Sequence, residues 1–473
     1  MIPERLEPLR DETQHLAEMF GGAGFRLYLV GGVVRDAIVD RLRPDYDLDF
    51  TTDALPDDIE RIVAKWADAV WAQGKRFGTI GLKKGDRLIE ITTHRAEAYA
   101  PDSRKPDVRF STSVEADLSR RDFTVNAMAL ELPEMRLVDP FGGVADLAAR
   151  RLRTPLSPEE SFSDDPLRML RAARFVAGYE LDPDDALVAA VRDMHPRLEI
   201  VSAERLRDEL DKLLVVPKPG PGLWFLVETG LAGEFLPELP GLALEQDPIH
   251  RHKDVLAHTV AVVERASPDR VLRLAALFHD VGKPKTRSIG PHGVSFHHHE
   301  VVGARMTRDR MRALRYSNED VEAVTRLVEL HLRFHGYDEG DGGWTDSAVR
   351  RYVRDAGPLL DRLNELTRAD CTTRNRRRAE ELARRMDSLE ARIAKLREQE
   401  ELDAIRPDLD GRQVIQLLGV PPGPIVGRAL AFLLDLRMEQ GPLGEEGARR
   451  ALAAWWEVEG AGAADARADP SPM

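Results

Sequence analysis

Two short runs near the start of the chain carry residues whose types and spacing suit phosphate chemistry. One is Leu29-Val30-Gly31-Gly32-Val33-Val34-Arg35-Asp36, and the other is Tyr46-Asp47-Leu48-Asp49-Phe50. A glycine pair between an apolar strand and a helix lets backbone N–H groups approach phosphate oxygens closely. Asp47 and Asp49 are two residues apart, so on a strand both carboxylates would point to the same face. Adjacent carboxylates repel each other, and Mg²⁺ held by oxygen ligands neutralises that repulsion.

Each of these runs also has a simpler interpretation. A glycine pair is common in turns, and Asp-x-Asp often marks a solvated strand face. Glu90, in Leu88-Ile89-Glu90-Ile91-Thr92, is open to the same two interpretations, because it projects from the face opposite to Ile89 and Ile91. As a third carboxylate on a neighbouring strand it would complete a two-metal site, which activates an attacking hydroxyl and stabilises a leaving pyrophosphate. The order of the glycines and carboxylates between Gly31 and Asp49 favours nucleotidyl transfer.

That order resembles the signature of the nucleotidyltransferase superfamily that contains DNA polymerase β, poly(A) polymerases and CCA-adding enzymes. The run Arg120-Arg121-Asp122-Phe123-Thr124-Val125-Asn126-Ala127-Met128-Ala129 is more specific, because it closely matches the RRDFTINAMA motif of class II CCA-adding enzymes and bacterial poly(A) polymerases. Taken without the resemblance, Arg-Arg-Asp would be an ion-paired surface corner. The resemblance implies that three carboxylates hold the catalytic Mg²⁺ ions, namely Asp47, Asp49 and Glu90. It also implies nucleotide contacts from Gly31, Gly32, Arg35, Arg121, Asp122 and Asn126.

The run from Ser163 to Phe175 predicts a helix that Ser163 or Asp164 caps, with proline in its first turn. The spacing of three residues places Asp165, Arg168 and Arg171 along one face of this helix. Taken without any resemblance, this spacing predicts a weak intrahelical ion pair. The run also resembles the EDxxR helix of the family, with Asp164 in place of the usual Glu. The resemblance implies that Asp165 and Arg168 pair with the edge of an incoming cytosine or adenine. Arg171 and Arg174 are expected to add nucleotide contacts, and residues 202–210 resemble the helix that supports this one.

A second set of chemically useful residues lies in the middle of the chain, around the run HDVGK at 279–283. A lone buried histidine is usually a core residue, but several His and Asp on separate helices suit a transition metal such as Ni, Mn, Zn or Fe. The pattern resembles the HD superfamily of metal phosphohydrolases. The resemblance implies core ligands from His258, His279, Asp280 and Asp370, with His299 and His331 as added ligands of a binuclear site. The alternative is a relic site whose side chains only support the helices.

The elements that must position these residues change in kind near Pro155. Before it, short apolar strands mix with helices, whereas after it the apolar spacing and the cap signals indicate helices almost to the end. We therefore expect an α+β fold with a polymerase-β-like nucleotidyltransferase head, made of a mixed sheet with helices, followed by an all-α body that includes an HD domain. The expected ranges are 1–154 for the head, 155–245 for a helical neck, 246–375 for the HD domain and 376–473 for a helical tail. Composition predicts a mobile loop at 99–110 and disorder from Glu457 onward.

The composition of the chain limits which binding partners and which cellular compartment we expect for it. The net charge of −14 over 473 residues disfavours a chain coated in nucleic acid, although it permits a transient RNA partner. No stretch approaches 18 uninterrupted apolar residues, so we expect no membrane partner. The single cysteine, Cys371, excludes an intramolecular disulfide and is consistent with a reducing cytoplasm.

The resemblance implies a template-independent enzyme that adds CCA to tRNA 3′ ends from CTP and ATP, with no DNA partner. The alternatives within the family are a poly(A) polymerase and enzymes that add only CC or only A. The acidic balance disfavours a polymerase of long tails, and the loop at 103–110 disfavours a CC-only enzyme. A chain that is mainly an HD phosphohydrolase is disfavoured by the complete set of head carboxylates, and a non-catalytic RNA scaffold has no need of them. The HD domain would add a phosphohydrolase activity at a tRNA end, such as a 2′,3′-cyclic phosphate.

Overall fold

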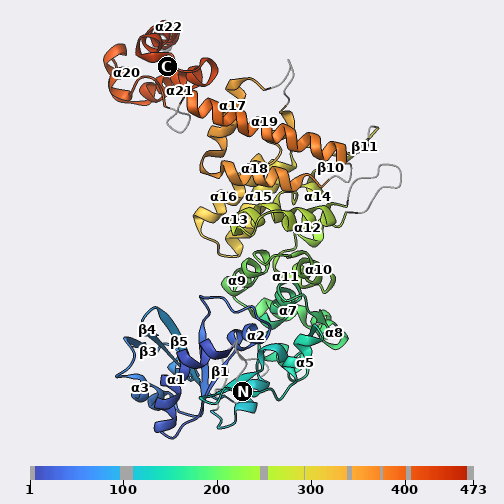
Figure 1. The fold of residues 1–473 in the computed structure, drawn as a ribbon. Coiled ribbons are helices and arrows are strands. Elements are labelled where there is room, and N and C mark those ends of the chain that lie inside the picture. The colour runs from blue at the N-terminus through green and yellow to red at the C-terminus, as the bar shows by residue number, and fades with distance from the viewer. Residues whose placement is uncertain are drawn as a thin grey trace, which may run out of the picture.

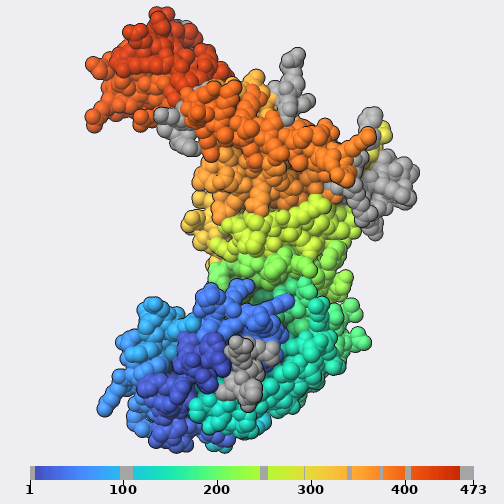
Figure 2. All heavy atoms as spheres, in the orientation of Figure 1, coloured from blue at the N-terminus to red at the C-terminus, as the bar shows by residue number. Residues whose placement is uncertain are grey.

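The computed structural model describes residues 6–95, 110–244, 254–291, 293–337, 344–372, 376–400 and 406–465. The molecule is elongated, with the N-terminal head at one end and the last helices at the other (Figure 1). Figure 2 shows that successive regions of the chain follow one another along the long axis. The predicted α+β class is confirmed. Of the loop predicted at 99–110, only Phe110 lies within the described residues.

The head contains a seven-stranded sheet in the order β3-β4-β5-β2-β1-β6-β7. Its strands are β1 (Leu27–Val30), β2 (Leu48–Thr52), β3 (Ala69–Trp71), β4 (Thr79–Lys84), β5 (Arg87–Thr93), β6 (Ala129–Leu132) and β7 (Arg136–Val138). Its helices are α1 (Glu7–Gly22), α2 (Gly32–Ile38), α3 (Pro56–Val63), α4 (Val114–Ser119) and α5 (Gly143–Ala148). Apolar side chains of the central strands, such as Leu29, Phe50 and Ile91, form the core of the head. A smaller cluster that includes Tyr28, Val30 and Ala129 covers part of the opposite face, and on β2 and β5 the burial of the first face fixes which residues face outward.

The pairing of β2 with β5 places the outward carboxylates next to each other. These two strands run parallel, and Asp49 lies directly opposite Glu90. Leu48 and Ile89 are buried on the other face, as the alternation of strand residues requires. Asp47 lies just before β2 rather than within it. Helix α2 begins directly after Gly31 and ends at Ile38.

The neck consists of short helices with one small two-stranded sheet. Its elements are β8 (Arg151–Leu152), α6 (Pro158–Asp164), α7 (Leu167–Gly178), β9 (Asp182–Pro183), α8 (Asp185–Met194), α9 (Ala203–Leu214), α10 (Gly220–Glu228) and α11 (Leu231–Phe235). The predicted helix start at Ser163 is wrong, because Ser163 and Asp164 belong to α6. Asp165 separates α6 from α7, because its backbone is extended (φ −145°, ψ 101°), as expected for a residue before proline. Its carboxylate accepts the Leu167 N–H at 3.1 Å and so caps α7.

The described residues of the rest of the chain form helices and one β-hairpin, which the sequence did not lead us to expect. The hairpin consists of β10 (Arg287–Gly290) and β11 (Gly293–Phe296). The helices before it are α12 (Val255–Arg265), α13 (Arg270–Phe278) and α14 (Lys283–Thr286). After it come α15 (His299–Ala313), α16 (Asn318–Leu330), α17 (Asp346–Ala356), α18 (Leu360–Asp370) and α19 (Arg376–Glu400). The last three are α20 (Gly411–Leu418), α21 (Pro424–Gln440) and α22 (Gly444–Asp465).

The hydrophobic cores divide the molecule into three parts. The neck, the helices around the HD run and α19 share one continuous core, which extends from Phe123 to Leu396. The head sheet has two clusters of its own, one on each face, and α20 to α22 form another core. Helix α22 continues past Glu457 to Asp465, so the disorder predicted from Glu457 does not begin there; residues 466–473 lie outside the described ranges. No helix of the described ranges has both the length and the apolar character needed to cross a membrane.

Candidate functional site

The three predicted head carboxylates lie near one another without conventional partners. Among the described residues, none of Asp47, Asp49 and Glu90 forms a hydrogen bond or an ion pair. Burial raises the pKa of Asp49 to about 6, repulsion from Glu90 and Asp47 adds to the rise, and Arg121 opposes it. The oxygen atoms of the three carboxylates do not all lie within 4.8 Å of one another. Two His and Asp groups of the described chain, both in the HD region, do meet that distance. Unpaired oxygen ligands that repel one another suit a divalent cation such as Mg²⁺.

The Gly31-Gly32 turn brings the backbone close to these carboxylates. Gly31 has φ +81°, a conformation that side-chain-bearing residues rarely adopt. A Cβ atom at Gly31 would lie 3.4 Å from Asp49 Oδ2 and 3.6 Å from Arg121 Nη1. The glycine turn, the carboxylate and the arginine therefore converge at one place, as the sequence predicted.

The Arg-Arg-Asp run connects the head to the neck through Asp122. The Asp122 Oδ2 atom accepts hydrogen bonds from Arg171 Nε at 2.8 Å and Nη2 at 2.6 Å, and Oδ1 accepts one from Asn126 Nδ2 at 2.9 Å. Burial alone would raise the pKa of Asp122, but Arg171 and Asn126 outweigh it and lower that pKa below its ordinary value. Arg171 also faces Glu209, to which Arg174 donates at 2.8 Å. The side chains of Asp122, Asn126 and Arg174 thus bind partners within the protein, and these contacts keep the residues of the site in place.

The two predicted base-reading residues already have protein partners. Asp165 accepts a hydrogen bond from Arg205 Nη2 at 2.6 Å, with its side chain about one-quarter exposed (26%). Arg168 donates to the side chain and the backbone carbonyl of Ser161 at 3.0 and 3.2 Å, and to the carbonyl oxygen of Arg120. An incoming base must therefore replace these contacts.

A cavity of about 330 Å³ is lined both by the Arg-Arg-Asp run and by the predicted base-reading residues. Six arginines line it together with only three carboxylates, so its walls favour an anion. The lining residues are Thr92, Arg95, Asp117, Arg120, Arg121, Asp122, Asp165, Leu167, Arg168, Arg171 and Arg205. The glycine turn and the head carboxylates do not line this cavity but adjoin it through Arg121.

The predicted nucleotide-binding residue Arg35 is buried away from the cavity. Its guanidinium donates to Asp36 Oδ1 at 2.9 Å and to Asn126 Oδ1 at 2.5 Å, and it contacts the Tyr179 hydroxyl. The guanidinium carbon also lies 4.1 Å from the centre of the Tyr179 ring. Arg35 therefore connects α2 to the end of α7.

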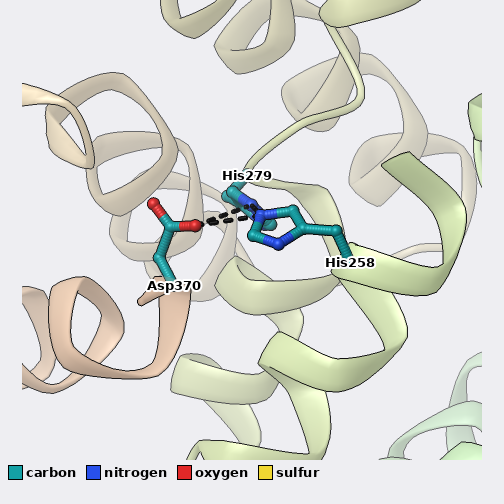
Figure 3. Close-up of side chains that lie close together, drawn as sticks. All are labelled: His258, His279 and Asp370. Carbon is teal, nitrogen blue, oxygen red and sulfur yellow. Dashed lines mark hydrogen bonds and ion pairs between the residues drawn. The ribbon is translucent and has the colours of Figure 1, made fainter. Parts of the chain in front are cut away.

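In the HD region, His258 from α12, His279 from the end of α13 and Asp370 from the end of α18 meet (Figure 3). Asp370 Oδ1 lies 2.9 Å from His258 Nε2 and 3.8 Å from His279 Nε2, and the two Nε2 atoms are 3.2 Å apart. Three ligand atoms from three helices thus face a common point, although 112 residues separate His258 from Asp370 in sequence.

A second set, made of Asp280, His299 and His331, lies beside the first and is fully buried. Asp280 joins the two sets, because Oδ2 lies 3.2 Å from His279 Nε2 and Oδ1 lies 3.3 Å from His299 Nε2. Lys283 Nζ donates to Asp280 at 2.5 Å. Two adjacent sets with one shared carboxylate are the arrangement that a binuclear centre requires.

The hydrogen bonds of the Nδ1 atoms determine which nitrogen of each histidine ring can bind a metal. The Nδ1–H groups of His279, His299 and His331 donate to the backbone carbonyls of Ala276, Phe296 and Val328 at 2.7, 2.8 and 2.6 Å. The Nε2 atoms therefore carry lone pairs and point inward, as in histidines that ligate metals. Nε2 of His299 and of His331 is buried without a hydrogen-bond partner. Burial, with repulsion from His279, lowers the pKa of His331 to about 3, so its ring is neutral. The donor set fits a transition metal.

All of these candidate ligands except His279 line a cavity of about 500 Å³. One wall is apolar and comes largely from α19, and the cations Lys283, Arg368 and Arg378 also line the space. The α19 residues of the wall are Ala379, Leu382, Ala383 and Met386.

Sequence reasoning missed three residues that hold these sites in place. Arg205 and Glu209 lie in the run that we had assigned only a supporting role, and a charge on a helix does not reveal its partner. Tyr179 follows α7 and belongs to no motif that we used. No local signal identifies it, because its partners Arg35 and Asp36 are more than 140 residues earlier.

Comparison with known proteins agrees with this geometry. The family described as "Poly A polymerase head domain" matches residues 27–153, "Probable RNA and SrmB- binding site of polymerase A" matches 180–242, and "HD domain" matches 255–397. The A-adding tRNA nucleotidyltransferase of Deinococcus radiodurans is 35% identical over 448 residues, which cover 91% of this chain and 95% of that protein. The CCA-adding enzyme of Streptococcus gordonii is 41% identical over 241 residues, which cover 50% of this chain and 58% of that enzyme.

Solved structures show the same fold over the whole length. The Bacillus stearothermophilus CCA-adding enzyme in complex with CTP aligns with a TM-score of 0.68 at 24% identity, covering 98% of this chain and 100% of that one. The Thermotoga maritima CCA-adding enzyme complexed with tRNA aligns with a TM-score of 0.56 at 19% identity, covering 96% of each chain. The family predicted from the motifs is thereby confirmed. This chain belongs to the tRNA nucleotidyltransferases that share the poly A polymerase head domain, and it carries an HD domain as well.

Proposed function

We propose that this enzyme adds nucleotides to the 3′ end of tRNA from CTP and ATP, in the cytoplasm, without a nucleic-acid template. The observation that carries the proposal is the arginine-lined cavity beside a glycine turn and three carboxylates that have no hydrogen bond or ion pair among the described residues. Arginines bind phosphate oxygens, and the carboxylates supply oxygen ligands for a cation, so the two together fit a nucleoside triphosphate with its metal.

Each part of the site has a proposed role. Asp47, Asp49 and Glu90 hold Mg²⁺, which lowers the barrier for attack of a 3′ hydroxyl on the α-phosphate when it is bound. Arg121 lies between the glycine turn and the cavity, where it would neutralise the triphosphate. Asp122 and Asn126 hold the adjoining backbone and Arg171, so the walls are already in place before the nucleotide arrives.

Asp165 and Arg168 are proposed to read the base. A carboxylate accepts from the exocyclic amine of cytosine or adenine, and a guanidinium donates to the ring acceptors. Uracil and guanine present a carbonyl where the amine should be. Because Arg205 holds Asp165 and Ser161 holds Arg168, binding of the correct base exchanges one set of hydrogen bonds for another.

The range of nucleotides added has two candidates. Full CCA addition is the prediction from the motifs, and the CCA-adding relatives support it. Addition of the terminal A alone is favoured by one observation, that the relative matched over nearly the whole chain is named an A-adding enzyme.

One assay separates these candidates. The enzyme is incubated with Mg²⁺ and with tRNA that lacks CCA or that ends in CC, with CTP, ATP or both, and the 3′ ends are sequenced. Restoration of CCA on the shorter tRNA indicates the full activity. Extension by A of only the CC-ending tRNA indicates the narrower one. Failure to extend either tRNA contradicts the proposal, and Asp49→Asn serves as the inactive control.

We also propose a phosphohydrolase activity in the HD domain, supported by the two sets of His and Asp and by the inward Nε2 atoms of His299 and His331, which have no hydrogen-bond partner among the described residues. The residues that would hold the transition metals are His258, His279, Asp280, His299, His331 and Asp370. Ni, Mn, Zn and Fe all suit such ligands. Bound metals would supply a nucleophile near neutral pH. A phosphate ester at a tRNA 3′ end, such as a 2′,3′-cyclic phosphate, is the proposed substrate, because it blocks the hydroxyl that nucleotide addition needs.

Elemental analysis and hydrolysis of a 2′,3′-cyclic phosphate test this second activity. Purified enzyme should contain a transition metal and open the cyclic ester, whereas Asp280→Ala should lose both the metal and the hydrolysis. Enzyme without metal, and without hydrolysis after addition of Ni, Mn or Zn, would mean that the site is a relic.

A further inference from the structure

Tyr179 lies where the head meets the neck and contacts both members of the Arg35-Asp36 pair. Its hydroxyl donates to Asp36 Oδ1 at 3.0 Å and accepts from Arg35 Nη2. Its ring lies under the Arg35 guanidinium and stacks on Phe175 of α7, with ring centres 5.3 Å apart. Figure 1 shows α2 beside α7 at this junction. Burial raises the pKa of Tyr179, so the hydroxyl keeps its proton and remains a donor.

A second route connects the same two helices. Arg35 donates to Asn126, Asn126 donates to Asp122, and Asp122 accepts from Arg171 in the middle of α7. Arg35 is thus tied to α7 at two points, through Tyr179 at the C-terminal end and through Arg171 further back. Two attachment points limit the tilt of α7 against α2 as well as the distance between the helices, which one point cannot do.

The two helices carry different halves of the nucleotide site. Helix α2 begins at the Gly31-Gly32 turn, beside Asp49 and Arg121. Helix α7 carries Arg168, one turn before Arg171, and follows Asp165 directly. The separation between the phosphate-binding turn and the base-reading residues therefore depends on how α2 sits against α7.

We propose that Tyr179 is a positioning residue for nucleotide selection, which sets the distance between the Gly31-Gly32 turn and the base-reading pair Asp165 and Arg168. Tyr179 does not line the arginine-lined cavity, so it would act through Arg35 and Asp36. When the triphosphate is held at the turn, a correct base reaches Asp165 and Arg168 only if this distance is right. If the contacts of Tyr179 with Arg35 and Asp36 are weakened, the distance between the turn and the base-reading pair varies. An incorrect base can then be accepted, because Asp165 and Arg168 no longer require one geometry.

The test compares Tyr179→Phe with the wild type. The variant keeps the ring and its stacking but loses both hydroxyl hydrogen bonds, each of which is to a charged side chain. We expect about a tenfold fall in kcat/KM for the correct nucleotide, with a similar loss of discrimination against UTP and GTP and an unchanged KM for tRNA. Tyr179→Leu, which also removes the ring beneath Arg35, should lose more of both. Retention of the wild-type discrimination in Tyr179→Phe would overturn the proposal.

Tyr352→Phe is a matched control, because Tyr352 is buried in α17 and its hydroxyl donates one hydrogen bond at 2.8 Å, to Asn364, far from the head. A purely structural role for Tyr179 predicts that both variants lower Tm alike and that neither changes the ratio of correct to incorrect addition. That outcome would also contradict the proposal. The inference rests on the proposed nucleotide addition, and wild-type enzyme that extends no tRNA would refute that function separately.

Discussion

At the scale of single residues, a few buried contacts decide what each functional side chain can do. The Nδ1–H groups of His279, His299 and His331 are held by backbone carbonyls, so the inward nitrogens are available to a metal. Asp122 is held ionised by Arg171, whereas Asp49, with no such partner, has a raised pKa. Residue type alone does not distinguish two such aspartates; their neighbours do.

The pH dependence of stability follows from Asp122. Its pKa is lower in the folded chain than the value of about 3.9 in an unfolded one, so its contribution to stability is present above about pH 4 and is lost as the pH falls further. Asp122→Asn should cost about 2 kcal/mol at about pH 7, and the difference from wild type should shrink toward about pH 3. Thermal unfolding of both proteins across this range measures it. A difference that grows on acidification would show that Asp122 is not ionised in the fold.

Base choice is the second property of single residues that can be tested. Asp165→Ala should reduce discrimination against UTP and GTP by about tenfold to a hundredfold while changing tRNA affinity little. Asp185→Ala, an exposed acid in the first turn of α8, is the control for loss of charge. Equal misincorporation by wild type and Asp165→Ala would mean that α7 has only a structural role.

At the scale of elements, backbone conformation places the functional groups. The left-handed Gly31 turns the chain directly from β1 into α2 beside Asp49, and Pro166 forces Asp165 out of the helix, so that its carboxylate caps α7 and also faces the cavity. The register of β2 on β5 places Glu90 opposite Asp49. These arrangements follow from local backbone rules, so their sequence signals are strong.

Gly31→Ala tests the turn. A Cβ atom there requires a backbone conformation that costs roughly 1–2 kcal/mol, and it would contact Asp49 and Arg121. We expect nucleotide addition to fall by at least about tenfold, with a smaller loss of thermal stability. Gly22→Ala at the end of α1, where a Cβ meets nothing within 4 Å, should leave addition unchanged. An active Gly31→Ala enzyme would show that close approach of this backbone is not needed.

At the scale of the whole molecule, the two proposed activities belong to different parts of an elongated chain. The head has its own core, whereas the HD ligands lie in the core that the neck, the HD helices and α19 share. The head carboxylates and the HD histidines have no residue in common, and each set would hold its own metal. The neck joins the two parts through contacts such as Arg207 with the Arg315 carbonyl and Tyr316 with Asp211.

We therefore expect the two activities to be lost independently. Asp49→Asn should abolish nucleotide addition and retain the transition metal and the ester hydrolysis, and Asp280→Ala should do the reverse. Both activities and the metal content are measured on the same preparations. Loss of both activities in either variant, without unfolding, would contradict this independence and indicate coupling through the neck.

The sequence by itself determined the family, the α+β class and the order of head and helical body, because each depends on short runs whose spacing has a local physical meaning. It also selected the His and Asp residues that gather in the HD region, whose role as metal ligands stays a prediction. Alternation in β2 and β5 and the Gly31-Gly32 turn are examples. Only the tertiary structure decided which distant residues meet. It paired Arg205 with Asp165, buried Arg35 against Tyr179, and closed the HD cavity with α19. Such contacts depend on how whole helices pack. A side chain's charge or ring does not specify a partner that lies 40 positions away, as for Arg205 and Asp165, or 144 positions away, as for Arg35 and Tyr179.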